Sequence, residues 1–458
     1  MAMVLVCGIA NLGCDYLLSA MARADHLMSQ NLQKSDDLSG LTIGTKGVGI
    51  SLVDATLAPA LAVGYPNEGT SLLGDDCSEK LLLKERCIEV PDLCKLFLGN
   101  LGFKCYALCV SLYCYGALWS FTAVFGNAVA LVAPNSSDPY AFSVLLYAII
   151  VIPMSFLELS EQKIVQVTLS AGRIFMIVLM IFTPLIATIF CHSNAQSSCT
   201  SHFSQQTMLN GAPLVNFSGF HRMMPIMVYA AIVHFSIPSL AQEVSQKSQL
   251  GNIFAMTSVL CAFLYTYIGT IGAWYFGGDV QQSVNLNWAD YHGGTGEIFS
   301  DADGQKLTWI HVAWWARMLS FFILIFPAIN VVSTFPLYAL SLGNDLMRIY
   351  YGDNVCLVEK NRRITSLFRA IAAIPPLIGG LFVRDLGTIA GYTGLSGLAI
   401  AFCFPALLYI RSTQKLKYMG IPYTTHYERL GSSIFAAGVV LIFGLVLIIG
   451  VFITLIVK

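Results

Sequence analysis

A histidine and a proline four residues apart lie in one long apolar run, 224–242. Pro238 has no N–H and crowds the carbonyl of residue 234, so a helix over this run is expected to break or kink between His234 and Pro238. A broken helix leaves polar backbone groups inside the run, where a solute can use them. We therefore predict a solute site at His234, Phe235, Ser236 and Pro238. A plain proline kink without a ligand fits the same pattern.

His234 is the ionisable residue that we single out deep inside a predicted span, where such residues are rare and often functional. An imidazole titrates near neutral pH, so His234 is expected to contact the solute or to take up a coupling proton. A buried histidine that is hydrogen-bonded to a neighbouring helix has the same sequence pattern.

A second polar group lies between two prolines of another apolar run. Asn330, Ser333 and Thr334 fall within about one helical turn, between Pro327 and Pro336. Carbonyl and hydroxyl oxygens near helix breaks suit a hard cation, so this group is a candidate Na⁺ site. Hydroxyls in a span also bond their own backbone or a neighbouring helix, and that alternative stays open.

A glycine-rich run, 391–397, contains Tyr392 and Thr393. Its glycines predict close helix packing or a bend. Tyr392 and Thr393 are candidate solute contacts or gate residues within it.

These side chains need helices in a lipid bilayer to position them. Hydrophobic residues make up 56% of the 458 residues and charged residues only 11%, against roughly 25% charged in a typical soluble domain. The apolar residues form runs of about 20, the length of a membrane span. The predicted spans are ten, at 3–22, 104–132, 140–158, 166–190, 224–242, 252–275, 313–339, 367–383, 387–410 and 433–456.

The distribution of Lys and Arg predicts the orientation of these spans. Alternate connections hold 19 of the 25 basic residues, and basic residues are in excess in cytoplasmic loops. The predicted cytoplasmic side therefore includes a long insertion, 29–95, within one polytopic domain that covers residues 1–458. The loops 191–222 and 277–308 are predicted to be extracellular or lumenal.

Two further features fall in the connections assigned outside. The N-x-S/T sequons at Asn135 and Asn216 predict glycosylation, with Asn216 the better acceptor. Cys191 and Cys199 flank a polar outer segment and could form a local disulfide. The other cysteines of the 13 lack paired C-x-x-C spacing and predict no zinc site.

Charged and aromatic residues near span ends are predicted to be anchors at the lipid headgroups. The charged set is Arg173, Glu158, Arg317 and Asp345, and Trp288 with Tyr291 is assigned to an outer aromatic belt.

The residues 224–240 and 326–336 resemble the sixth and eighth helices of the amino acid/auxin permease family, and the opening run into Ala20–Ala24 resembles the end of its second helix. Within that family the resemblance is nearest to the transmembrane protein 104-like branch. It implies an all-α, LeuT-like inverted-repeat bundle of five plus five helices with one extra C-terminal helix. Ten spans place both termini outside, so we expect eleven spans in the full-length protein and the first to be absent here.

The resemblance implies a secondary active transporter that moves amino acids, coupled to Na⁺ or H⁺, in the plasma membrane or a vacuolar or lysosomal membrane. An amino-acid sensor without net flux, or a truncated product that does not transport, are the alternatives. The expected partners are the lipid bilayer and the small solute. No cofactor, nucleic acid or ATP-binding cassette is expected, and no paired mid-membrane carboxylates or Ser/His/Asp grouping predicts an enzyme.

Overall fold

The computed structural model describes residues 2–41, 80–83, 88–132, 138–156, 163–193, 220–276, 280–293, 295, 297–300, 307–310, 312–352, 355–358, 361–429 and 431–456. Within these ranges the helices are joined by loops, and the extended structure is one antiparallel hairpin, in which β1 (Glu297–Ser300) pairs with β2 (Leu307–Ile310), and an isolated bridge between Leu81 and Thr425. A chain in lipid has no water to satisfy its backbone, and helices meet that requirement within each segment.

The first half of the chain contributes α1 (Ala2–Leu41), α2 (Val90–Val132), α3 (Pro139–Met154), α4 (Lys163–Ser193), α7 (Phe220–Ala231), α8 (Ile237–Glu243) and α9 (Leu250–Phe276). The second half contributes α10 (Trp314–Tyr351), α11 (Val355–Val358), α12 (Arg362–Phe382), α13 (Leu386–Leu398), α14 (Phe404–Tyr418) and α15 (Ile434–Ile456). Short 3₁₀ turns cover His234–Ser236, Lys247–Gln249 and Val284–Asp290, and a π turn covers Ala399–Cys403.

Nine helical segments of the described chain are long and apolar enough to cross a membrane. They coincide with nine of the ten predicted spans. The remaining prediction, 140–158, is α3, which is apolar but only 16 residues long. The helices also reach into the predicted insertion 29–95, because α1 continues to Leu41 and α2 begins at Val90.

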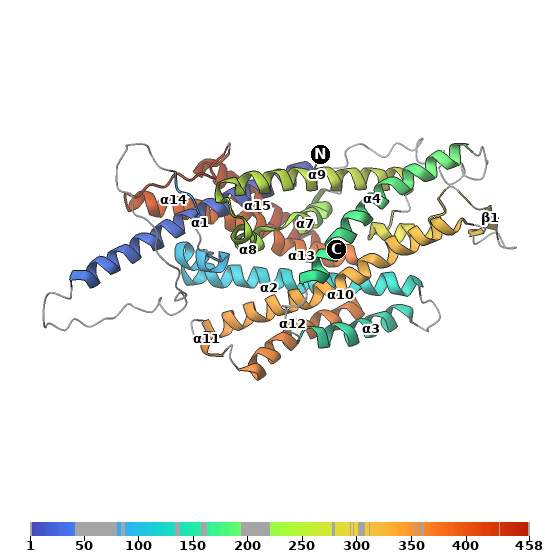
Figure 1. Cartoon of the computed structure of the whole chain (residues 1–458), viewed down its shortest axis with the longest axis horizontal. Helices are drawn as coiled ribbons and strands as arrows, with labels where there is room; N and C mark the ends of the chain where they lie inside the picture. Colours follow the sequence, from blue (N-terminus) through green and yellow to red (C-terminus); the bar gives the residue numbers. More distant parts are fainter. Residues whose placement is uncertain are drawn as a thin grey trace.

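The helices run roughly along the long axis of the molecule (Figure 1). The hairpin β1–β2 lies at one end, and α11 and the start of α2 lie at the other (Figure 1). The basic connections assigned to the cytoplasm by charge include those next to α11 and α2. We call this end the inner end, following that predicted orientation.

The helices differ strongly in how much of their surface other helices cover. In the most apolar stretch of the segment Leu386–Tyr418, 72% of residues are buried, against 22% for Ile434–Ile453 and 11% for Lys247–Phe276. α13 and α14 are therefore central, and α9 and α15 expose apolar faces that suit lipid.

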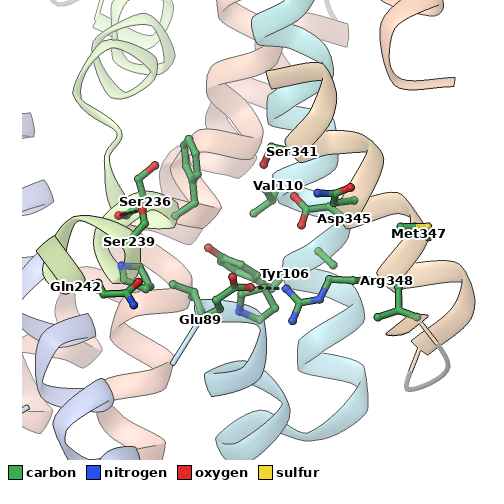
Figure 2. A pocket seen from close by; sticks show the side chains of 17 residues that line it. Glu89, Tyr106, Val110, Ser236, Ser239, Gln242, Ser341, Asp345, Met347 and Arg348 are labelled. Carbon is green, nitrogen blue, oxygen red and sulfur yellow. Dashed lines mark hydrogen bonds and ion pairs between the residues drawn. The ribbon is translucent and has the colours of Figure 1, made fainter. Parts of the chain in front are cut away.

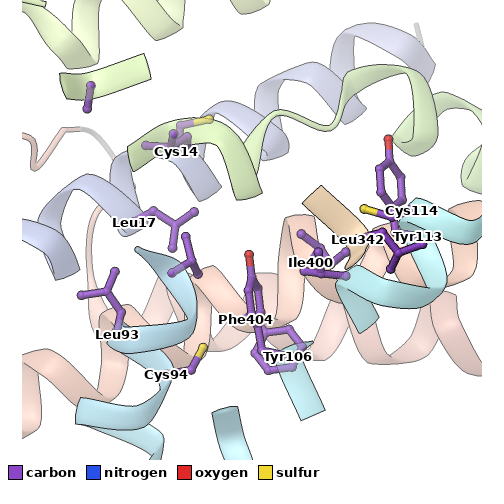
Figure 3. Close-up of a cluster of buried hydrophobic side chains, with 14 of the residues drawn as sticks. Cys14, Leu17, Leu93, Cys94, Tyr106, Tyr113, Cys114, Leu342, Ile400 and Phe404 are labelled. Carbon is purple, nitrogen blue, oxygen red and sulfur yellow. The ribbon is translucent and has the colours of Figure 1, made fainter. Parts of the chain in front are cut away.

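The main core lies where α1, α2, α10 and α14 meet. Cys14 and Leu17 of α1 and Leu93 of α2 belong to it, and the rings of Tyr106 and Phe404 meet edge to face at 5.0 Å (Figure 3). The other side chains labelled in Figure 3 are Cys94, Tyr113, Cys114, Leu342 and Ile400. The buried cysteines Cys14, Cys94 and Cys114 pack in this core as small apolar side chains.

Two helices change path at residues with an evident cause. α2 kinks at Gly99, whose φ of 75° favours glycine. The π turn Ala399–Cys403 precedes Pro405, which cannot donate to the carbonyl of Ala401. By contrast, α10 continues as one helix through Pro327 and Pro336.

Candidate functional site

The helix predicted over 224–242 is interrupted. α7 ends at Ala231, one 3₁₀ turn covers His234–Ser236, and α8 starts at Ile237. Val233 turns the chain, with φ −134° and ψ −5°. Pro238 lies in the first turn of α8, where a proline is tolerated, and cannot donate to the carbonyl of residue 234. The residues that leave the helix are Ile232 and Val233, so the interruption begins before His234, whereas the break was predicted between His234 and Pro238.

Tyrosine hydroxyls from two neighbouring helices bond the carbonyls that the interruption frees. Tyr113 of α2 donates to the carbonyl of Tyr229 at 3.4 Å, and Tyr265 of α9 donates to that of Ala230 at 3.3 Å. A helix end buried in a bundle needs such partners for its last carbonyls. The two tyrosines thus stabilise the end of α7 without a continuing helix.

His234 ties the interruption to α1. Its side chain is fully buried, and Nε2–H donates to the carbonyl of Ala10 at 2.9 Å. The Cys14 sulfur lies 4.0 Å from the same nitrogen, while Nδ1 has no hydrogen-bond partner within the described residues. A methyl group on Gly13 would come within 2.6 Å of Nε2, so only glycine allows this approach. His234 therefore holds the interrupted helix in place against α1.

A pocket of about 570 Å³ lies beside the second half of the interrupted helix (Figure 2). Glu89, just before α2, and Val355 of α11 belong to its lining, so it lies toward the inner end. Figure 2 shows α8 on one side, α10 on the other and Tyr106 of α2 between them. Phe235, Ser236 and Pro238, three of the predicted site residues, line it, but His234 does not. The lining is Glu89, Val90, Pro91, Tyr106, Ala107, Val110, Phe235, Ser236, Pro238, Ser239, Gln242, Ser341, Asn344, Asp345, Met347, Arg348 and Val355.

The pocket carries charges of both signs. Arg348 pairs with Glu89 (Figure 2). Its second terminal nitrogen lies 3.6 Å from a carboxylate oxygen of Asp92, which is outside the lining. Asp345, one turn before Arg348 on α10, lines the pocket and has no ion pair among the described residues. The pocket therefore offers one carboxyl group that is not already paired with the guanidinium.

Uncharged hydrogen-bonding groups complete the lining. The hydroxyl of Tyr106 is buried and has no partner within the part of the chain that the structure describes. Ser236 of the 3₁₀ turn, with Ser239 and Gln242 of α8, lines the space from the opposite side (Figure 2). A few polar groups around an apolar wall suit a small polar solute.

Sequence reasoning missed most of the charged and hydrogen-bonding groups of the pocket. It took Asp345 for a headgroup anchor and passed over Glu89, Tyr106 and Arg348. The available signal was the pair of opposite charges at positions 345 and 348, which lie on one face of a helix at the end of an apolar run.

The candidate gate residues Tyr392 and Thr393 lie away from the pocket. Tyr392 is 56% exposed on the outside of α13. Thr393 is buried, donates to the carbonyl of Ile389 at 2.7 Å and packs against Gly116 of α2. The glycine-rich run acts in packing, because a methyl group on Gly394 would lie 2.1 Å from a backbone oxygen of α7.

The candidate Na⁺ ligands Asn330, Ser333 and Thr334 lie together on α10, outside the pocket. Both hydroxyls donate to the carbonyl of Asn330, at 3.1 Å and 2.8 Å. The side-chain oxygen of Asn330 accepts from Nε of Arg173 at 2.8 Å. Arg173, predicted to be a headgroup anchor, instead brings a positive charge to the group that was expected to bind a cation.

The remaining predictions fall largely on residues that the structure does not describe. Asn135, Asn216 and Cys199 lie outside the described residues, as does the side chain of Cys191.

The prediction of an outer aromatic belt is wrong for Trp288 and Tyr291. Trp288 is 1% exposed and donates to the Thr183 hydroxyl at 2.9 Å, and Tyr291 donates to the Thr183 carbonyl at 2.8 Å. Both rings pack inside the protein rather than at a lipid interface.

Fold and site together define the chain as a multi-pass helical membrane protein with an interrupted helix beside a polar pocket. No protein-family model matches it. It is a distant homologue of the transmembrane protein 104 proteins. It is 22% identical over 346 residues to the Transmembrane protein 104 homolog of Dictyostelium discoideum, over 74% of this chain and 65% of that protein.

Two animal proteins show the same level of similarity. Identity is 21% over 349 residues with human Transmembrane protein 104, covering 70% of this chain and 63% of the relative. With the Caenorhabditis elegans homolog it is 25% over 378 residues, covering 70% and 69%. The chain thus spans just under two thirds of the length of the Dictyostelium and human relatives.

Proposed function

We propose that the protein is a secondary active transporter that carries amino acids, or similar small solutes, across a membrane. The observation that carries the proposal is the interruption at His234–Ser236 beside a polar pocket that opens at the inner end. Carriers commonly bind solute at a discontinuous helix and expose the site to one side at a time. We therefore assign the present arrangement to the inward-open state of such a carrier.

The lining of the pocket supports an amino acid as the solute. Asp345 suits an ammonium group, and the Tyr106 hydroxyl and the polar side chains of α8 suit carboxylate and polar side-chain atoms. The resemblance of residues 224–240 and 326–336 to helices of amino acid permeases points to the same class. By that resemblance the helices form two inverted repeats, and Na⁺ or H⁺ supplies the driving force.

Uptake into proteoliposomes tests the proposal. The purified chain is reconstituted, and entry of labelled L-amino acids is measured under imposed Na⁺ and H⁺ gradients. We expect uptake of at least one amino acid, and its loss in Ser236→Trp, which fills the pocket. Ser170→Trp, on the exposed face of α4, is the matched control and should transport as the unmodified protein does.

The alternative function is a sensor that binds an amino acid without moving it. Saturable binding without uptake under any gradient would replace the transporter with this sensor. Absence of both binding and uptake would overturn the assignment of the pocket to amino acids.

A further inference from the structure

Asp15, near the middle of the α1 span, has a carboxyl group without a hydrogen-bond partner. The residue is 1% exposed, and neither carboxyl oxygen is bonded within the described part of the chain. Asn11, one helical turn earlier, also has a buried side-chain oxygen without a partner there. Burying a lone ionised carboxylate costs several kcal/mol, so a group in this position needs a proton or a cation.

Arg429, in the loop between α14 and α15, faces Asp15 across a gap. A methyl group on Gly251, at the start of α9, would lie 3.1 Å from Nη2 of Arg429 and 3.5 Å from Oδ1 of Asp15. Arg429 is not bonded to Asp15 and donates instead to the side-chain oxygen of Asn252. Because Gly251 has no side chain, the Asp15 carboxyl and the Arg429 guanidinium have room to meet after a small movement.

The guanidinium of Arg429 favours a proton over a cation as the ligand of Asp15. A positive charge beside the gap disfavours Na⁺ at Asp15, whereas it stabilises the carboxylate that remains after a proton leaves. Arg429 is partly exposed at the inner end of the protein, so the gap lies close to water on that side.

The helix that carries Asp15 also holds the interrupted helix. The carbonyl of Ala10 accepts the hydrogen bond from His234, and Gly13 lies against the same ring. α1 packs beside α9 and also contacts the 3₁₀ turn His234–Ser236. Asp15 therefore lies on the same helix as the residues that hold His234, within about two helical turns of them.

We propose that Asp15 is the proton-binding site of the carrier and exchanges its proton with the solution at the inner end. In the arrangement described here, the carboxyl group of Asp15 carries its proton and is separated from Arg429. When α1 moves, the O–H bond breaks, the proton passes to water, and the carboxylate pairs with Arg429. This proposal rests on the proposed transport function and adds the ligand that drives it.

The other titratable and charged groups around Asp15 come from five elements. They are Cys14 and Tyr16 on α1, Tyr409 on α14 behind Tyr16, Glu428 beside Arg429 in the loop, Lys247 before α9, and His234 behind Cys14. Glu428 pairs with Arg23 at 2.6 Å, and Lys247 donates to the carbonyls of Ala241 and Gln242. These partners leave Arg429 as the charge available to Asp15.

Infrared difference spectroscopy of the reconstituted protein tests proton binding without requiring transport. The protein should show a protonated-carboxyl band that titrates with pH and is missing from Asp15→Asn. Asp25→Asn, a buried carboxyl further along the same helix, is the matched control and should keep the band. Equal spectra for Asp15→Asn and the unmodified protein would overturn the proposal.

Uptake of a mixture of labelled L-amino acids tests the coupling. A single titrating group changes its protonated fraction by up to about tenfold per pH unit, so a pH gradient should stimulate uptake by up to that factor. Asp15→Asn should lose this stimulation and keep exchange of internal for external solute. Gly251→Ala, which fills the gap, should keep the infrared band and lose the stimulation.

The outcomes separate the two proposals. Uptake by Asp15→Asn or Gly251→Ala with unchanged pH dependence would overturn the coupling role while leaving transport intact. A titrating band that depends on Asp15, in a protein that takes up nothing, would overturn the transport function and leave the proton site standing.

Discussion

Replacement of His234 by alanine removes the contact that ties the interrupted helix to α1. The ring is fully buried, and Nε2–H donates to the carbonyl of Ala10 at 2.9 Å. A buried hydrogen bond contributes about 1 kcal/mol, and truncation of a large buried side chain leaves a cavity that costs about 2 kcal/mol or more. His234→Ala should therefore weaken the attachment of the interrupted helix to α1 by about 3 kcal/mol, which is roughly a hundredfold in the equilibrium between the attached and detached arrangements.

His234→Gln is the matched variant, because its side-chain amide can donate to the same carbonyl and does not titrate. At equal amounts in the membrane, we expect uptake to fall roughly a hundredfold in His234→Ala and by less than about tenfold in His234→Gln. Normal uptake by His234→Ala would refute the anchoring role. Equal loss in both variants, with both folded, would show instead that the ring itself must titrate or touch the solute.

Three further predictions concern packing and charge. Gly394→Ala should destabilise the protein by about 3 kcal/mol in thermal unfolding, because the methyl group meets a backbone oxygen of α7, whereas Gly391→Ala meets nothing within 4 Å and should be neutral or stabilising. Arg23→Met leaves a carboxylate and two carbonyls without their buried donor and should cost about 3–5 kcal/mol by the same measurement; an unchanged unfolding midpoint would contradict that. The Arg384 guanidinium holds the pKa of Asp138 in the folded protein below its ordinary value. The pair therefore stabilises the folded protein fully at pH values above the ordinary pKa of Asp138, and this stabilisation is lost as the pH falls through the lowered pKa. Unfolding midpoints of the unmodified protein and Asp138→Asn should thus differ at neutral pH and converge in acid, and a constant difference would argue against the pair.

Local features of the sequence predicted the helices and the interruption. Apolar runs of about 20 residues must become helices in lipid, and nine of the ten predicted spans are helices long enough to cross it. Pro238 predicted a break within about one turn of itself, because its missing N–H affects only nearby residues, but the chain leaves the helix slightly earlier, at Ile232 and Val233. Such consequences depend on near neighbours in the chain, so they can be read from one sequence.

Contacts between distant helices were not predictable in the same way. Arg173 was assigned to the lipid interface, but it bonds Asn330 because α4 packs against α10. Trp288 likewise packs against α4 through Thr183. Asp15 was overlooked although it lies inside the predicted span 3–22, since a carboxyl in an apolar run gives no sign of which helix covers it.

Access to the pocket at the interrupted helix tests the central claim most directly. Ser239 is exposed in the pocket, so Ser239→Cys, in a background with the native cysteines replaced, should react with a membrane-impermeant maleimide from the inner side. A transported amino acid should slow that reaction, while the buried control Thr393→Cys stays unreactive. No reaction of Ser239→Cys from either side, or a reaction that no transported amino acid slows, would contradict a solute site at this position.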